Sequence, residues 1–204
     1  NIIFMTNSDF SFPCLDLPIK SNHNILGVVT NPPQKMGRKK KQINNAITLK
    51  CDEIGVRTIT QQDLNDVTFE NELKKYDADL LVVVAYRILP KNLLTIPKLG
   101  CINLHGSLLP AYRGAAPIQW SLINGDKQTG LTTFLIEPKV DTGAIIKQKR
   151  IKILENENYG SLKNRMAIEG ATLLLDTINL ITDGKILPIQ QEKNNKENDF
   201  YKLE

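Results

Sequence analysis

The feature that most constrains the fold is a short, uninterrupted apolar run, Leu80-Leu81-Val82-Val83-Val84-Ala85. A strand that faces solvent on one side alternates apolar with polar residues, and this run has no polar face. A strand of this kind is covered on both sides, which is typical of the centre of a parallel sheet. The run is also far shorter than the roughly 20 residues that cross a bilayer. It therefore predicts a buried strand and not a membrane span.

Short β-rich segments alternate with helix-like segments on both sides of this run. We predict strands over residues 1–5, 25–30, 80–85, 101–105, 130–136 and 144–153, and helices over residues 44–53, 71–76, 117–123 and 161–181. The repeated β-α-β order predicts an α/β fold, a Rossmann-like, parallel-rich sheet with helices on both faces. Ligands of such sheets bind beyond the carboxyl ends of the strands, which draws attention to the loops after Met5, Ala85, His105 and Ile136. No G-x-G-x-x-G or Walker A sequence follows a predicted strand, which disfavours dinucleotide and P-loop enzymes.

Composition adds limits on compartment and partners. The 204 residues, 41% hydrophobic and 24% charged, fit one soluble domain, and the net charge of +4 permits an anionic partner without requiring one. Cys14, Cys51 and Cys101 are scattered and lack metal-ligand spacing, so we interpret them as reduced thiols in a cytosol-like compartment. From Gln190 to Asp199 the chain is dense in Gln, Glu, Lys and Asn, which is typical of a solvated linker. We therefore predict a catalytic domain over residues 1–189 and a linker over residues 190–204.

Two polar residues alternate along a predicted strand in the segment Cys101-Ile102-Asn103-Leu104-His105-Gly106. Alternate side chains of a strand share a face, so Asn103 and His105 point the same way. An amide can donate hydrogen bonds to a developing oxyanion, and an imidazole can carry protons near neutral pH. The pair is a candidate for catalysis, with a hydrogen-bonded structural role for His105 as the alternative. The other histidine, His23, lies in a polar turn and is interpreted as solvated.

A second candidate is the acid in Pro138-Lys139-Val140-Asp141-Thr142-Gly143, a Gly-bounded loop after a predicted strand. Such a loop can meet the His105 loop across the sheet, where the Asp141 carboxylate would orient the imidazole. On spacing alone, the favoured interpretation is that Asp141 caps a turn, and Glu137 competes for the role of orienting the imidazole.

Basic residues provide two further candidates. Arg113 precedes Gly114-Ala115-Ala116-Pro117, a helix start with Pro in its first turn, and could bind an anion or form a salt bridge. The densest basic run, Lys35 to Lys41, follows two prolines and is expected to be an exposed loop. Taken alone, a basic run of this kind is interpreted as a solvated surface.

Three segments together resemble the signature of the 10-formyltetrahydrofolate-dependent formyltransferases, and specifically of the branch that formylates methionyl-tRNA. The wider family shares the Asn, the His, the Ser-Leu-Leu-Pro and the Asp, and the Gly-Ala-Ala-Pro-Ile-Gln continuation points to the tRNA branch. The resemblance extends from Ile2 through the last predicted helix. The three segments are Asn103-Leu104-His105-Gly106-Ser107-Leu108-Leu109-Pro110, Arg113-Gly114-Ala115-Ala116-Pro117-Ile118-Gln119 and Val140-Asp141-Thr142-Gly143.

The resemblance implies a role for each matching residue. Asn103 would stabilise the oxyanion formed when an amine attacks the formyl carbon, His105 would shuttle protons, and Asp141 would hold His105. The folate pocket would be formed by Tyr86, Arg87, Ile88, Leu89, Ser107, Leu108, Leu109, Pro110 and Val140. The tRNA would be bound by Arg38, Lys39, Lys40, Lys41 and Arg113.

The same resemblance implies the reaction and its partners. The formyl group of 10-formyltetrahydrofolate would pass to the α-amine of initiator methionyl-tRNA, with tetrahydrofolate released and no metal involved. We expect a monomer that contacts no membrane, in the bacterial cytoplasm or alternatively in an organelle. The tRNA branch also carries a C-terminal OB-like domain, to which residues 190–204 would lead.

Two departures and two alternatives accompany this resemblance. Residues 6–10 lack the Gly-Thr-Pro that usually precedes Asp-Phe in the tRNA branch. The segment Ala85 to Pro90 is one residue shorter than usual and is more similar to the glycinamide ribonucleotide enzymes. A nucleotide-amino-sugar formyltransferase, which shares a segment like Trp120 to Gly125, or another formyltransferase or hydrolase that uses 10-formyltetrahydrofolate, is the first alternative. A catalytically idle folate- or RNA-binding module is the second.

Overall fold

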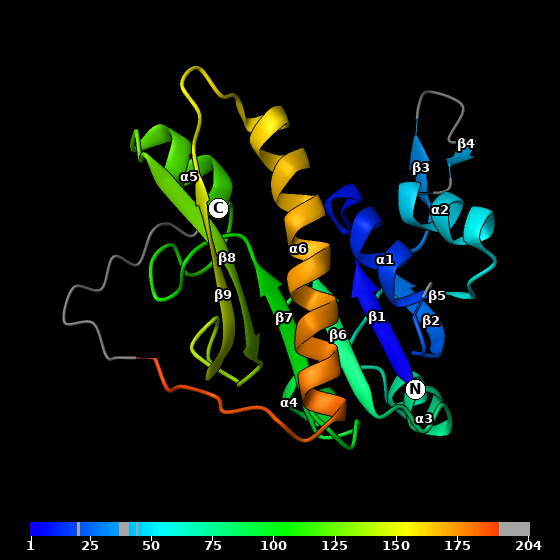
Figure 1. Ribbon diagram of the computed structural model, residues 1–204. Helices are drawn as coiled ribbons and strands as arrows, with labels where there is room; N and C mark the ends of the chain where they lie inside the picture. Colours follow the sequence, from blue (N-terminus) through cyan, green and yellow to red (C-terminus); the bar gives the residue numbers. More distant parts are fainter. Residues whose placement is uncertain (20, 37–40, 44, 192–204) are drawn as a thin grey trace. The chain divides into compact units, whose positions relative to one another are not determined.

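The computed structural model describes residues 1–19, 21–36, 41–43 and 45–191. The chain divides into two compact units, Asn1–Cys101 and a second that begins at Ile102 (Figure 1). The boundary falls at the start of a strand, inside the region predicted to be one catalytic domain. In the described residues no helix combines the length and the apolar character that a membrane crossing requires.

The first unit is built on parallel strands in the order β5-β2-β1-β6. Phe4 of β1 lies opposite Val28 of β2 on one side and Val82 of β6 on the other. All five residues of β6 are buried, as are all five of β1, which confirms that the apolar run is a covered, parallel strand. The strands are β1 (Ile2–Thr6), β2 (Ile25–Thr30), β5 (Thr58–Thr60) and β6 (Leu80–Val84).

Helices and a hairpin complete the described part of this unit. The helical segments are η1 (Asp9–Ser11), α1 (Phe12–Ile19), α2 (Ala46–Ile54), α3 (Val67–Lys75) and α4 (Lys91–Leu94), and the hairpin pairs β3 (Gln34–Met36) with β4 (Lys41–Ile43). The side chain of Asn45 caps α2, and that of Asp66 caps α3, each by accepting a hydrogen bond from a backbone N–H of the first turn.

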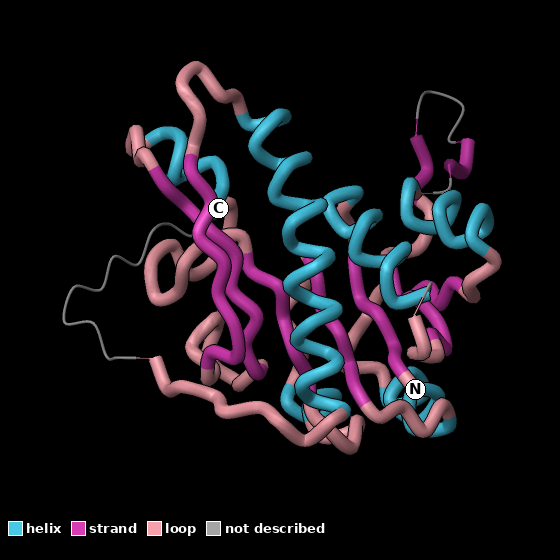
Figure 2. The backbone as a smooth tube through the Cα atoms, viewed as in Figure 1, coloured by secondary structure: helices cyan, strands magenta, loops and turns pink. Residues whose placement is uncertain are grey.

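The second unit contains β7 (Cys101–His105), α5 (Pro117–Ile123), β8 (Gln128–Leu135), β9 (Ile145–Lys152) and α6 (Tyr159–Thr182). The long helix α6 packs against β8 and β9 (Figure 2). Close approach is possible because α6 has Gly170 at the contact, where a Cβ would lie 2.9 Å from Leu104 and 3.6 Å from Leu131. A buried hydrogen bond of 2.8 Å also joins Thr133 of β8 to Thr177 of α6.

The α/β class is confirmed, but β8 runs antiparallel to both of its neighbours, β7 and β9. The repeated β-α-β pattern had indicated parallel neighbours, and for β9 the connection explains the difference. Residues 136–144 form no helix and are fewer than the dozen or so that a parallel crossover needs. As a consequence, the end of β8 at Leu135 lies opposite Ile102, near the start of β7, and not beside His105.

Candidate functional site

Strand β7 presents Asn103 and His105 on the face opposite to α6. Leu104, between them, points to α6 at Gly170, so its two neighbours in the strand point the other way. His105 is buried, with 6% of its surface exposed, and Asn103 is half-buried. In the described part of the chain the Asn103 side chain has no hydrogen-bond partner, which leaves its amide available to a ligand.

The two ring nitrogens of His105 have different partners. Nε2 lies 2.7 Å from the backbone carbonyl oxygen of Tyr112. A carbonyl oxygen can only accept, so Nε2 carries its hydrogen and donates. Nδ1 lies 3.5 Å from Oδ2 of Asp141, which is long for a hydrogen bond but within the range of an ion pair. Nδ1 is thus the nitrogen that is not committed to the Tyr112 carbonyl, and it faces a carboxylate.

Asp141 both orients a turn and approaches the histidine, so the two roles open to it are compatible. It has a positive φ of 51°, which Asp tolerates better than most residues. Its Oδ2 accepts a 2.8 Å hydrogen bond from the N–H of Gly114, and its carbonyl accepts a 3.1 Å bond from Nε of Arg113. Glu137, the competing acid, is exposed and is not within ion-pair distance of His105 in the described residues.

The loop between β8 and β9 must return along β7 to reach His105. Leu135 pairs with Ile102, three residues before His105, which corresponds to roughly 10 Å of strand. The return ends at Gly143, where the backbone packs so closely on β8 that a Cβ would lie 1.6 Å from the carbonyl oxygen of Leu135. A side chain at this position would collide with backbone, which explains the Gly that follows Asp141-Thr142.

The segment from Ser107 to Pro110 is held by side chains of β8 and β9. Thr132 donates to the carbonyl of Ser107 at 2.7 Å and accepts from the N–H of Leu109 at 3.1 Å. Gln148 donates to the carbonyl of Leu109 at 2.9 Å, and the Leu109–Pro110 peptide is cis. The buried Ser107 hydroxyl donates to the carbonyl of Ala111, so it supports the loop from within.

These positions differ in what they could offer a folate. Leu109 is buried, Leu108 and Pro110 are half-buried, and Val140 is 42% exposed. All four lie in the second unit with the catalytic candidates.

The predicted folate residues Tyr86 to Leu89 lie in the first unit, directly after β6. The Arg87 guanidinium donates to the carbonyls of Gln61 and Gln62, both at 2.6 Å, and to the Tyr86 hydroxyl at 2.9 Å. Burial raises the pKa of Tyr86, and the contact with Arg87 opposes this rise. Leu89 is buried and Ile88 is 72% exposed. The Arg87 side chain therefore holds the turn at residues 61–62 next to the Tyr86–Leu89 segment.

The predicted tRNA residues fall partly outside the described chain. Arg38, Lys39 and Lys40 lie outside it, and Lys41 begins β4. Arg113 is described. Among the described residues it contacts no carboxylate, and it donates instead to the Asp141 carbonyl and to the side-chain oxygen of Gln191.

Two contacts of this site were not predicted from the sequence. The backbone carbonyl of Tyr112 holds His105, and no sequence pattern specifies a backbone acceptor. Gln191 lies within the stretch interpreted as a linker, and its composition gave no signal of a role in the site.

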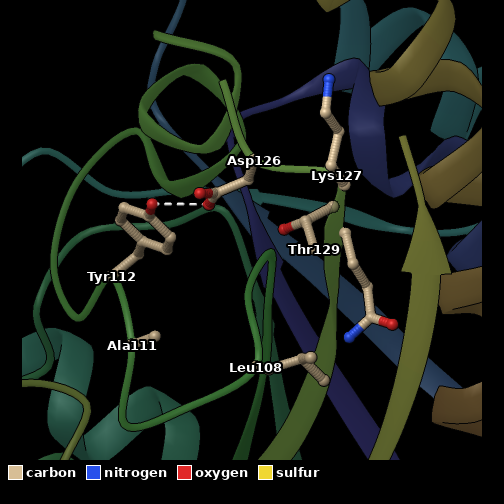
Figure 3. Close-up of a pocket in the computed structure, with 7 residues that line it drawn as sticks. Leu108, Ala111, Tyr112, Asp126, Lys127 and Thr129 are labelled. Carbon is tan, nitrogen blue, oxygen red and sulfur yellow. Dashed lines mark hydrogen bonds between the residues drawn. The ribbon is translucent and has the colours of Figure 1, made fainter. Parts of the chain in front are cut away.

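A cavity of about 380 Å³ opens beside the Leu108–Tyr112 loop (Figure 3). The Tyr112 hydroxyl donates to Asp126 at 2.6 Å and accepts from Asn124 at 3.0 Å. These bonds hold the side chain of the residue whose carbonyl contacts His105. The cavity is lined by Leu108, Ala111, Tyr112, Asp126, Lys127, Gln128 and Thr129.

Within the described ranges, no three His, Cys, Asp or Glu residues are grouped so that they could hold a metal ion. The chemistry that the described groups offer is polar and acid–base: a carboxylate, an imidazole, an amide and a guanidinium.

Proteins with known names are similar to this chain in sequence over nearly its whole length. The family model described as "Formyl transferase" matches residues 1–178. The chain is 42% identical over 202 residues to the methionyl-tRNA formyltransferase of Flavobacterium johnsoniae, covering 99% of this chain and 64% of that protein. It is 40% identical over 192 residues to the methionyl-tRNA formyltransferase of Porphyromonas gingivalis, covering 94% and 59%. The chain thus spans less than two thirds of the length of these relatives.

Solved structures share the fold. Glycinamide ribonucleotide transformylase 1 from Symbiobacterium toebii superposes with a TM-score of 0.77 at 20% identity, covering 94% of this chain and 93% of that one. A sugar 3N-formyl transferase, crystallised in the presence of dTDP and 5-N-formyl-THF, gives a TM-score of 0.70 at 18% identity, covering 96% and 67%. The Rossmann-like formyltransferase fold is thereby confirmed. With the family model matching residues 1–178, the sequence resemblance is confirmed as well, and the chain belongs to the formyl transferase family.

Proposed function

We propose that this chain transfers the formyl group of 10-formyltetrahydrofolate to the α-amine of initiator methionyl-tRNA. The observation that carries the proposal is the contact of His105 with Asp141 on the face of β7 that also presents Asn103. The names of the relatives at about 40% identity support methionyl-tRNA as the acceptor. The crystallisation of a fold relative with 5-N-formyl-THF supports a folate as the donor.

The transfer requires attack of a neutral amine on the formyl carbon. The attack makes a tetrahedral intermediate with one negatively charged oxygen, and the amine nitrogen must lose a proton before the folate nitrogen leaves. The free Asn103 amide is suited to donate a hydrogen bond to that oxygen. Such a donor stabilises the intermediate more than the ground state, which is what accelerates the reaction.

Proton transfer would involve the Nδ1 side of His105. Nε2 is committed to the Tyr112 carbonyl, so only Nδ1 can exchange a proton without breaking that bond. The Asp141 carboxylate lies beside Nδ1, where it can hold the ring in its orientation. The pair can thus accept the proton from the amine and return it to the departing nitrogen. Their 3.5 Å separation is expected to shorten once substrate is bound.

The substrates would be bound by the residues that the family resemblance indicates. By that resemblance, the segment Tyr86 to Leu89 would contact the pterin, and Ser107 to Pro110 and Val140 would also contact the folate. Arg113 has no carboxylate partner among the described residues, so its charge is available to a phosphate of the tRNA. Residues 38–41 would add further phosphate contacts, and residues 190–204 would lead to an OB-like domain that grips the tRNA.

We also infer a cellular compartment and an oligomeric state from this proposal. Initiator tRNA is used where translation starts, so the bacterial cytoplasm is the inferred site of action. All three proposed catalytic residues come from one chain, and a monomer is therefore sufficient for the chemistry.

The test follows consumption of 10-formyltetrahydrofolate in three parallel reactions that offer charged initiator tRNA, a nucleotide amino sugar, or water alone. Each reaction is run with wild type, His105→Ala and His23→Ala, the last being a matched control in a polar turn. We expect turnover with methionyl-tRNA only, lowered on the order of 10²-fold by His105→Ala and unchanged by His23→Ala. Turnover with the sugar, or equally with water, would reject the proposed acceptor. Wild-type turnover by His105→Ala would reject the proposed catalytic role.

A further inference from the structure

The chain after α6 returns to the candidate site. Gly184, with a φ of 66°, ends the helix, and the following segment runs back toward β9 (orange in Figure 1). Ile189 pairs antiparallel with Ile145 at the start of β9 through two backbone hydrogen bonds of 2.8 Å. The side chains of Leu187 and Ile189 are 87% and 70% exposed, so at these two residues the segment is held by its backbone and not by apolar packing.

Two residues further on, the side chain of Gln191 makes four hydrogen bonds within the site. Its oxygen accepts from Nη2 of Arg113 at 2.6 Å and from Nε at 3.1 Å. Its amide nitrogen donates to the carbonyls of Asp141 at 3.0 Å and Gly143 at 2.8 Å. These bonds require a side chain of this length that carries one acceptor oxygen and two N–H donors. The amide of glutamine provides all three groups.

These bonds fix the groups around His105. Asp141 has a backbone conformation that is costly for a residue with a side chain, and its carbonyl is held by both Gln191 and Arg113. The same residue directs its carboxylate to Nδ1 of His105. Gln191 also fixes the Arg113 guanidinium without neutralising it, because an amide oxygen carries no net charge.

We propose that Gln191 is a positioning residue, which holds the Asp141 loop against His105 and Arg113 ready for an anionic group of the acceptor. The kinetic part of this inference rests on the proposed formyl transfer, whereas the geometric part does not. Gln191 also connects the site to the segment that follows α6, so the placement of that segment would affect the chemistry.

The test compares Gln191→Ala and Gln191→Glu with Gln190→Ala, a control that removes an exposed glutamine one residue away. Gln191→Glu keeps an acceptor for Arg113 but replaces the N–H donors with a carboxylate facing two carbonyl oxygens. The main readout is the ¹⁵N spectrum of the imidazoles, which contains two sets of ring signals because the chain has two histidines, His23 and His105. This readout does not depend on activity. Turnover and the melting temperature are measured alongside it.

Both Gln191 variants are expected to move the His105 ring signals, leave those of His23 in place, and lower kcat on the order of 10-fold. Gln190→Ala should match wild type in all three measurements. The inference is overturned if the His105 signals and kcat of Gln191→Ala equal those of the control. It is equally overturned if Gln191→Ala moves both histidines and lowers the melting temperature steeply, because the role would then be structural. Failure of wild type to transfer a formyl group to any acceptor would reject the proposed function, and the ring signals would still decide the positioning role.

Discussion

At the scale of single residues, the candidate site depends on backbone groups as much as on side chains. The Tyr112 carbonyl determines which nitrogen of His105 can exchange a proton, and the Gly114 N–H determines where the Asp141 carboxylate lies. Tyr112 and Asp141 both have positive φ values, 56° and 51°, that are uncommon for residues with side chains. The two loops on either side of His105 are thus shaped by constrained backbone that their mutual hydrogen bonds stabilise.

Asp141→Asn tests whether the charge beside Nδ1 matters apart from the shape of the loop. The amide oxygen can still accept from Gly114, so the fold of the loop is retained, but the negative charge beside Nδ1 is removed. We expect kcat for formyl transfer to fall roughly 10²-fold, with little change in the KM for 10-formyltetrahydrofolate. Steady-state kinetics give both values. The control is Glu137→Gln, an exposed acid of the same loop, and equal losses in the two variants would contradict the assignment.

Gly143→Ala tests the close approach that brings the Asp141 loop back to the site. Its Cβ would lie 1.6 Å from the Leu135 carbonyl oxygen, so the loop or the strand must move. We expect a loss of about 3 kcal/mol in the free energy of unfolding, measured with urea. Gly160→Ala, in the first turn of α6, is the control. Its Cβ would lie 3.4 Å from the side-chain oxygen of the N-cap residue Asn158, which requires no backbone to move. That change should be neutral or stabilise by about 0.5 kcal/mol, and equal effects at both glycines would argue against the close approach.

Sequence predicted the types of the catalytic candidates and their common face, because strand alternation and short motifs act locally. The convergence of His105 and Asp141 depends on a loop path, and the resemblance to a family, more than the spacing, pointed to it. Gln191 could not be found in this way. Its four hydrogen bonds join residues 48 to 78 positions earlier in the chain, and no local pattern encodes such contacts.

At the scale of elements, the prediction was good where apolar patterns are long and poor where they are short or interrupted. The predicted bounds of β2 and α5 match the structure, and α6 was found to within two residues at its start. Helix α1 was missed because Pro13 and Pro18 lie within its eight residues, and proline normally marks a helix end. β5 has three residues, too few to show a period. The antiparallel direction of β8 in the second unit could not be predicted, because the residue pattern of a strand does not specify its direction relative to its neighbours.

Buried thiols within these elements predict how stability depends on alkaline pH. Burial raises the pKa of Cys14 on α1 and of Cys101 on β7 to about 12, from an ordinary value of 9.0. Between these values the unfolded chain releases a proton that the folded chain keeps. The stabilisation is therefore complete below pH 9 and disappears as the pH rises toward 12.

Each of the two thiols is expected to lower the free energy of unfolding by about 1.4 kcal/mol per pH unit above roughly 9. Urea unfolding at about pH 8, 9.5 and 10.5 measures this slope. A Cys14→Ala/Cys101→Ala variant should be less stable at the lowest pH and should show a shallower alkaline slope, since tyrosines and lysines titrate equally in both proteins. Parallel slopes in the variant and wild type would rule out the thiols as the cause.

At the scale of the whole molecule, the net charge of +4 is small, and what matters is where the basic residues are concentrated. Five of the 26 lie between Lys35 and Lys41, in a stretch whose central residues are outside the described structure. A net charge of this size gives weak attraction to any polyanion, whereas a local cluster gives a defined number of phosphate contacts. These two effects predict different responses to mutation and to salt.

Two triple variants separate the general attraction from the local phosphate contacts. The first changes Lys39, Lys40 and Lys41 to Gln. The second is the control and changes three exposed lysines of α3 and α4 to Gln: Lys74, Lys75 and Lys91. Both triple variants remove three positive charges and lower the net charge from +4 to +1, so a general electrostatic attraction would weaken equally in the two. If the cluster binds phosphates, kcat/KM for methionyl-tRNA falls further in the first variant. The slope of log kcat/KM against log salt concentration then becomes shallower by roughly 2 to 3 in that variant. Each phosphate that a lysine neutralises adds about 0.7 to 0.9 to the steepness of this slope. The KM for 10-formyltetrahydrofolate, measured in the same assays, should stay at the wild-type value, because phosphate binding to the tRNA does not affect the donor. Equal salt slopes in the two variants would mean that the basic run is an ordinary solvated surface, and tRNA recognition would then have to reside in Arg113 and in parts of the protein beyond the described residues.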